Sequence, residues 1–73
     1  MAMATLSECV EQIGKTAGDL WHLLDEHGPI PLTRLIKQCD APRDVTLQAI
    51  GWLAREEKIS IDEEGRKKIV SLI

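Results

Sequence analysis

The sequence predicts one mainly α-helical domain that ends in a small β-hairpin, and three observations lead to this prediction. Apolar residues recur at helical spacing from the N-terminal region to about residue 57. The period then shortens to two, and a glycine-containing turn separates two short runs of β-branched and apolar residues. A chain of 73 residues has material for only one hydrophobic core. We therefore expect a single domain over residues 1–73.

The first predicted element is a long helix. Its apolar residues are spaced by four and three positions, which places them on one stripe: Leu6, Val10, Ile13, Ala17, Leu20 and Leu24. The helix should begin near Thr5 or Ser7, whose hydroxyls can cap the first turn. It should end at His27, because Gly28 can adopt the left-handed conformation and Pro29 cannot continue the helix.

Two features of this helix carry expectations about packing. Gly14 and Gly18 flank the apolar stripe, and each costs about 1 kcal/mol relative to alanine in a helix interior. Such a cost indicates the close approach of another backbone. The chain has no Phe or Tyr, so Trp21 and Trp52 are its only large aromatic side chains, and we expect Trp21 in the core.

Two shorter helices should follow a Pro-rich extended segment at residues 28–31. The first covers two turns, with apolar residues at Leu32, Leu35, Ile36 and Cys39. Pro42 fits the first position of the next helix, and Asp44 lies in its positive first turn. This third helix should reach about Glu57 and bury Val45, Ala49, Ile50 and Leu53.

The remaining residues predict a β-hairpin. Residues 58–62 alternate polar and apolar side chains, residues 63–65 (Glu-Glu-Gly) indicate a turn, and residues 66–73 are rich in β-branched residues. In the second strand, Val70 and Leu72 share one face, and Ile69, Ser71 and Ile73 share the other.

This order of elements resembles a winged helix-turn-helix domain over essentially the whole chain. The most specific part is the run Ala49-Ile50-Gly51-Trp52-Leu53-Ala54-Arg55-Glu56-Glu57-Lys58-Ile59. It is similar to a family of small stand-alone winged helix-turn-helix proteins of bacteria and archaea whose function is unassigned. The resemblance implies three helices and a two-stranded wing, with room for a short extra edge strand. Glu57 replaces the usual glycine of the turn, so we expect a less sharply defined helix end.

The resemblance also implies DNA binding, with the third helix in the major groove and the wing on the phosphates. The net charge of -3 does not exclude this role, because residues 1–27 carry -4, residues 28–57 are neutral and residues 58–73 carry +1. The candidate nucleic-acid contacts are Arg43, Gln48, Arg55, Arg66, Lys67 and Lys68. Two alternatives remain open: Gln48 and Arg55 can belong to an ordinary solvated helix face, and the wing cations can protect an exposed strand edge from aggregation.

The outer face of the third helix also fits protein contact. At 100° per residue it presents an apolar strip with Trp52 at its margin, so the candidate interface residues are Leu47, Gly51, Trp52 and Ala54. In the alternative interpretation, Trp52 packs over the chain's own wing and the strip is too small to bind a partner. The sequence narrowly favours a non-catalytic binding module that contacts protein, either a second copy or another chain, through the third helix and wing. Binding of duplex DNA through the same elements is the alternative.

The sequence contains no pattern that predicts an enzyme. His22 and Glu26 lie one helical turn apart without a third metal ligand, and Cys9 and Cys39 lie in or beside apolar stripes without a positioned base. No P-loop, GxGxxG or GxSxG motif is present. We expect no catalytic residue, cofactor, metal or small-molecule substrate. Two isolated cysteines, with neither a signal peptide nor a membrane span, predict a cytoplasmic protein.

Overall fold

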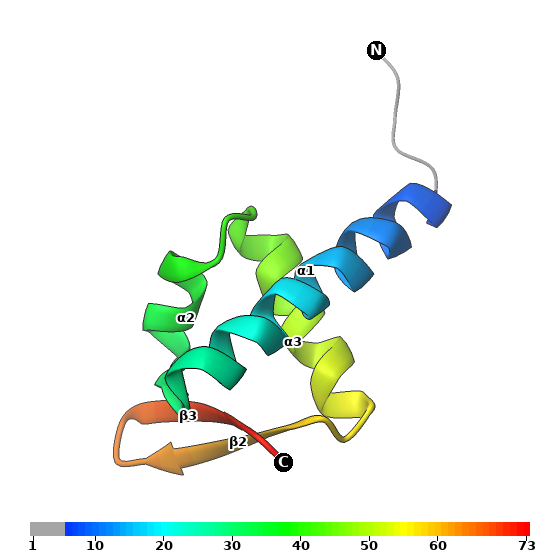
Figure 1. Ribbon diagram of the computed structural model, residues 1–73. Helices are drawn as coiled ribbons and strands as arrows, with labels where there is room; N and C mark the ends of the chain where they lie inside the picture. The colour runs from blue at the N-terminus through cyan, green and yellow to red at the C-terminus, as the bar shows by residue number, and fades with distance from the viewer. Residues whose placement is uncertain (1–5) are drawn as a thin grey trace.

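The computed structural model describes the backbone of residues 6–73 and the side chains of residues 8–73. Three helices pack above a small antiparallel sheet (Figure 1). In chain order the elements are α1 (Leu6–His27), β1 (Ile30–Pro31), α2 (Leu32–Gln38), α3 (Arg43–Arg55), β2 (Ile59–Glu64) and β3 (Lys67–Leu72). The predicted fold class, three helices with a β wing and a short extra edge strand, is confirmed.

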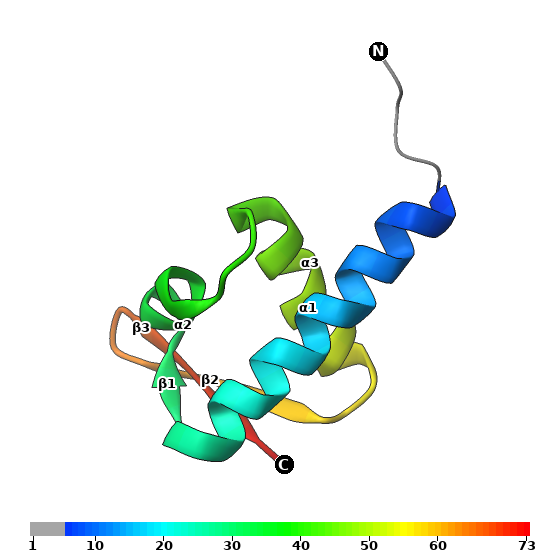
Figure 2. The ribbon, with the colours of Figure 1, turned by 45° about the horizontal axis from the view of Figure 1, so that its top comes forward.

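Helix α1 has a packed half and a projecting half. Ala17, Leu20 and Leu24 are buried, whereas Val10 on the same stripe is 41% exposed. The reason is visible in Figures 1 and 2, where the first turns of α1 extend beyond the other helices. The predicted cap at Thr5 lies outside the described residues. The predicted end at His27 is confirmed: Gly28 has φ +75° and its N–H donates to the Leu24 carbonyl at 2.8 Å.

Helix α3 buries a different set of side chains from the predicted one. Val45 is only half-buried, and Thr46 takes its place as a fully buried residue beside Ala49, Ile50 and Leu53. The Thr46 hydroxyl donates to the Pro42 carbonyl at 3.0 Å, so its burial leaves no unsatisfied donor. Pro42 occupies the N-cap rather than the first helical position. The polar character of threonine explains why the apolar pattern alone gave the wrong residue.

The C-terminus of α3 is sharply defined, contrary to expectation. The helix ends at Arg55, two residues earlier than predicted, and Glu57 adopts φ +58°. The N–H of Lys58 donates to the Leu53 carbonyl at 3.0 Å, and the N–H of Glu57 donates to the Ala54 carbonyl at 3.1 Å. These two bonds form a Schellman motif. The chain therefore turns into the wing as it would with glycine, although a glutamate occupies the left-handed position.

The sheet has the strand order β1-β3-β2, so β3 is its central strand. Ile30 of β1 and Ile61 of β2 both lie opposite Val70, which is fully buried. The hairpin turn is Gly65-Arg66 rather than residues 63–65, because β2 continues through Glu64, which pairs with Lys67. Gly65 has φ +62°, as the first residue of a two-residue hairpin turn requires.

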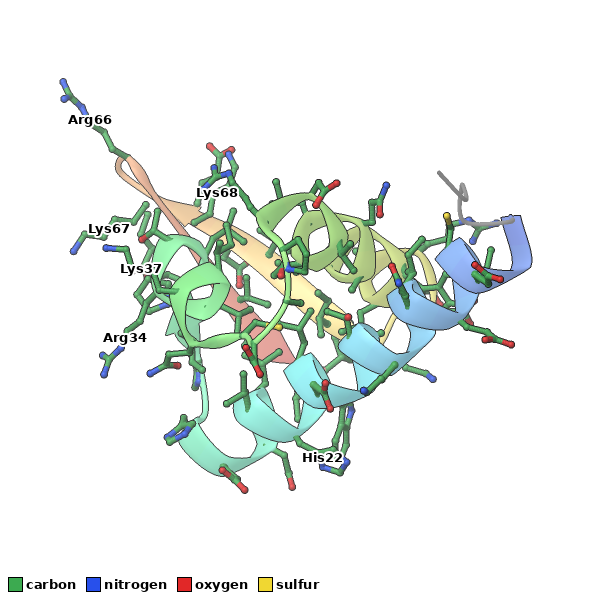
Figure 3. The ribbon with its side chains drawn as sticks, turned by 90° about the horizontal axis from the view of Figure 1, so that it is seen from above. His22, Arg34, Lys37, Arg66, Lys67 and Lys68 are labelled. Atoms are coloured by element: carbon green, nitrogen blue, oxygen red, sulfur yellow. The ribbon has the colours of Figure 1, made fainter. Side chains whose placement is uncertain are left out.

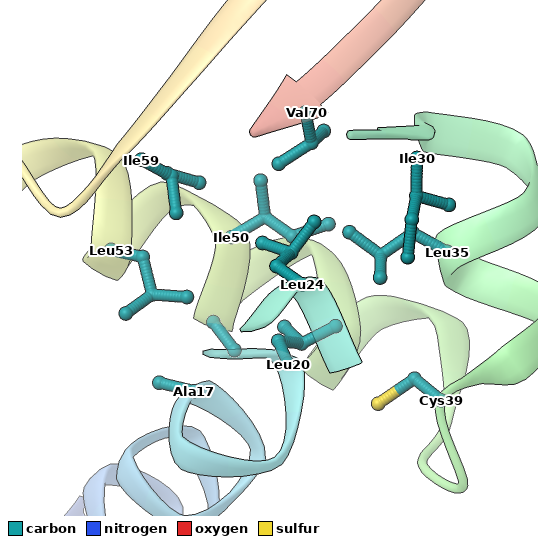
Figure 4. Close-up of a cluster of buried hydrophobic side chains, with 11 residues drawn as sticks. Ala17, Leu20, Leu24, Ile30, Leu35, Cys39, Ile50, Leu53, Ile59 and Val70 are labelled. Atoms are coloured by element: carbon teal, nitrogen blue, oxygen red, sulfur yellow. The ribbon is translucent and has the colours of Figure 1, made fainter. Parts of the chain in front are cut away.

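One cluster of buried apolar side chains joins all six elements (Figure 4). Two predictions about packing are wrong. Trp21 is 36% exposed and does not belong to this cluster. A Cβ added at Gly14 or Gly18 would meet nothing within 4 Å, so no other part of the described chain approaches these glycines. The buried set comprises Ala17, Leu20, Leu24, Ile30, Leu35, Cys39, Ala49, Ile50, Leu53, Ile59 and Val70.

Candidate functional site

A hollow of about 470 Å³ lies between α1 and the C-terminal half of α3. Both tryptophans line it, and their exposed fractions are 36% for Trp21 and 41% for Trp52. Gly14 and Gly18 line it from α1, and the space above them is open. We call these four residues the aromatic face. The remaining lining residues are Ala17, His22, Leu53 and Lys58.

The hollow contains only part of the predicted protein interface. Of the four predicted residues, only Trp52 lines it. Leu47 is 39% exposed and Gly51 is exposed, but both lie outside the hollow, and Ala54 is half-buried against the core. Sequence reasoning missed Trp21, which it assigned to the core. The available signal was its position one helical turn after Gly18 and two turns after Gly14, on the same side of the helix as both.

A second hollow, of about 390 Å³, lies between the start of α2 and the wing turn. Arg34 of α2 lines it together with Arg66, Lys67 and Lys68 of the wing; Pro31, Leu32 and Thr33 complete it. Lys37 lies one turn after Arg34 on α2, and Figure 3 shows Arg34, Lys37 and Lys67 extending on the same side of the molecule. The structure thus adds two α2 cations, which sequence reasoning missed, to the predicted wing cluster.

The cations around this hollow differ in how they are paired. Lys68 donates from Nζ to Oε1 of Glu63 at 3.1 Å across the hairpin. Arg34, Lys37, Arg66 and Lys67 are exposed and have no ion-pair partner among residues 8–73. We call these four residues the basic face. Their charges are therefore available to an external anion.

The other predicted nucleic-acid contacts do not join this face. Arg43, Gln48 and Arg55 are exposed on α3. Arg43 and Arg55 are the first and last residues of a 13-residue helix, and a rise of 1.5 Å per residue separates their Cα atoms by about 18 Å along its axis. Neither they nor Gln48 line the basic hollow. Asp44 follows Arg43 and Glu56 follows Arg55, so acidic groups flank both arginines.

The described residues place the histidines and cysteines apart from any metal-binding group. No group of three His, Cys, Asp or Glu residues in this described part of the chain could hold a metal ion. His22 makes an edge contact with Trp21, with ring centroids 5.5 Å apart and planes at 88°. Cys39 is buried and Cys9 is exposed; both are free thiols. No helix in residues 6–73 is long and apolar enough to cross a membrane.

Comparison with known proteins gives two matches. The family model described as a winged helix-turn-helix domain (DUF2582) matches residues 9–72. An uncharacterised protein of Methanocaldococcus jannaschii is 33% identical over 63 residues, which cover 84% of this chain and 90% of the relative. The family match includes every residue that lines the two hollows.

Proposed function

This chain belongs to the winged helix-turn-helix family (DUF2582), and on that premise we propose that it is a protein-binding module that self-associates through its aromatic face. The observation that carries the proposal is the position of both tryptophans, half out of the core, around one hollow. Tryptophan is among the residues that contribute most to protein interfaces. The chain has only two aromatic residues of the Phe, Trp and Tyr type, and both are exposed on the same surface. They are the residues that can anchor an interface at this surface.

The shape of the aromatic face favours a second copy as the partner. Projecting indoles and an open wall of two glycines lie on the same surface. In a twofold dimer each copy presents the same patch, so an indole of one copy can occupy the space above the glycines of the other. The only formally charged residue lining the hollow is Lys58. No acidic side chain of α1 lines the hollow, so the hollow itself adds no repulsion between carboxylates.

The projecting half of α1 adds apolar surface beside the hollow. Val10 is 41% exposed and Ile13 is only partly buried, although both belong to the stripe that fills the core further along the helix. An isolated helical end is marginally stable in water, so a contact that covers it stabilises α1. This surface has few residues compared with the roughly 20–30 per partner of a standard interface. We therefore expect a weak, concentration-dependent dimer.

Sedimentation equilibrium over a concentration series, with tryptophan emission followed in parallel, tests the proposal. We expect the apparent mass to rise towards that of a dimer while the emission shifts to shorter wavelength as the indoles leave water. Trp52→Gln should raise the dimer dissociation constant by at least about tenfold. Gly18→Gln should do the same by filling the hollow, without loss of monomer stability.

The matched control is Ile61→Gln, because Ile61 is 40% exposed, lies on β2 and is not part of the hollow. It should leave the dissociation constant unchanged. A protein that sediments as a monomer at every concentration contradicts the proposal. An equal effect of the Ile61 and Trp52 substitutions would show that self-association does not use the aromatic face.

A further inference from the structure

We propose that the basic face binds the sugar–phosphate backbone of a nucleic acid without reading its base sequence. This inference does not depend on self-association, because the two hollows share no lining residue. The supporting observation is the convergence of cations from two elements: Arg34 and Lys37 from α2, and Arg66 and Lys67 from the wing. Residues 34 and 66 lie far apart in the sequence and meet because β1 pairs with β3 (Pro31 opposite Ile69).

The charge of the protein is separated in space. Helix α1 carries five acidic residues and one lysine among its described side chains, whereas the basic face holds four cations without ion-pair partners among residues 8–73. Nearby acids reduce this potential only in part. Glu63 is engaged by Lys68, and Glu64, opposite Lys67 in the hairpin, does not line the hollow. A protein of net charge -3 thus has one surface suited to a polyanion.

The composition of the basic face favours nucleic acid over an acidic protein segment. Protein interfaces depend on a few buried aromatic or aliphatic anchors. The exposed large apolar residues of the described chain all lie outside the basic hollow; they are Val10, Trp21, Leu47, Trp52, Ile61 and Ile73. Two guanidinium groups, Arg34 and Arg66, offer paired donors that match phosphate oxygens, and Lys37 and Lys67 add point charges. Such a surface gains its binding energy from phosphate charge.

The same face lacks the means to read bases. Direct readout uses side chains on an element that enters a groove, as the third helix of a typical winged helix does. Here α3 does not belong to the basic face, and its outer side carries Asp44 and the apolar Leu47. Contacts from α2 and the wing can therefore position the domain on a backbone but not select a sequence.

A fluorescence anisotropy titration of mixed-sequence duplex DNA at low salt tests this proposal. We expect binding that weakens steeply with salt, with a log–log slope approaching about -3.6 if all four cations contact phosphates. Arg34→Gln with Lys67→Gln should weaken binding by about tenfold or more and reduce the slope by about two.

The matched control is Arg43→Gln with Arg55→Gln, which removes the same charge from α3. This control should keep the salt dependence of the wild type and lose clearly less DNA affinity than the Arg34→Gln, Lys67→Gln variant. An equal loss in both double variants would overturn the assignment to this face. If the protein does not bind DNA at low salt, the proposal is wrong. If polyglutamate displaces DNA at equal charge, the proposal is also wrong, and the face would instead bind an acidic protein.

The Trp52→Gln variant separates this proposal from self-association. Its DNA affinity per protomer and its salt slope should be retained even if it no longer dimerises. Loss of the slope in Trp52→Gln would contradict the independence of the two faces. A monomeric wild type with an intact slope would overturn self-association and leave nucleic-acid binding in place.

Discussion

Glu57 is the residue at which a single backbone conformation controls the path of the chain. It is the only non-glycine residue with positive φ among residues 6–73. The Schellman bonds of Glu57 and Lys58 terminate α3 and direct the chain into β2. An L-amino acid pays a steric cost in this region that glycine does not. The tertiary structure holds Glu57 there because Leu53 and Ile59, on either side of the turn, are both buried in the core.

Glu57→Gly should therefore stabilise the domain by about 0.5–1 kcal/mol, since glycine adopts φ +58° without strain. The measurement is the free energy of unfolding from urea denaturation. Glu56→Gly is the matched control, because Glu56 has φ -80° and gains nothing from glycine there. The control should be destabilised by a similar amount. A Glu57→Gly protein less stable than wild type would contradict the strain at this position.

Helix α1 is the element whose two halves have different roles. Its C-terminal half supplies Ala17, Leu20 and Leu24 to the core. Its N-terminal half projects from the domain and leaves Val10 exposed (Figure 2). Gly14 lies between the two halves and Gly18 one turn later. Neither glycine is required by a neighbouring group within the described chain, so each imposes a cost on the monomer without a compensating contact.

Gly14→Ala and Gly18→Ala should each stabilise the monomer by about 1 kcal/mol, because alanine has the higher helix propensity and the added methyl meets nothing within 4 Å. Thermal unfolding at a concentration too low for self-association checks this. Gly28→Ala is the control. Because Gly28 has φ +75°, which alanine adopts only with strain, this substitution should lower the stability of the domain. If Gly14→Ala lowers the stability, the added methyl group must meet a neighbour, which would contradict the open space around Gly14.

At the scale of the whole molecule, one core of buried apolar side chains holds the six elements together. Leu35, from a helix of only seven residues, is fully buried, as are Leu20, Leu24 and Val70. A short chain with one core has a small margin of stability. The aromatic face and the basic face share no residue and differ in composition.

Leu35→Ala should lower the free energy of unfolding by about 2–5 kcal/mol, through lost apolar contact and a cavity. Because there is one core, helix and sheet signals should be lost together in a single urea transition. Ile61→Ala, on a residue 40% exposed, is the comparison and should cost less than about 1 kcal/mol. Separate transitions for α2 and the hairpin would contradict a single core.

The sequence by itself determined the elements, their order and most of their boundaries. Helical and strand periodicity, Gly28 after α1 and Gly65 in the hairpin turn are local signals, because they depend on the backbone hydrogen bonds and dihedral angles of neighbouring residues. The wing cations and Trp52 are exposed, although the sequence leaves open whether Trp52 packs over the wing. The sequence did not predict the burial of Thr46. Its hydroxyl donates a hydrogen bond to the Pro42 carbonyl, and a pattern of apolar residues does not show such a bond.

Only the tertiary structure decided which surfaces those residues compose. Trp21 is exposed because α1 meets α3 without covering it, and the glycines beside it remain open. Arg34 joins Arg66 because the two-residue strand β1 pairs with β3 and brings α2 to the wing. Both outcomes depend on contacts between residues far apart in the chain. The spacing of residues within a short stretch of sequence does not predict such contacts.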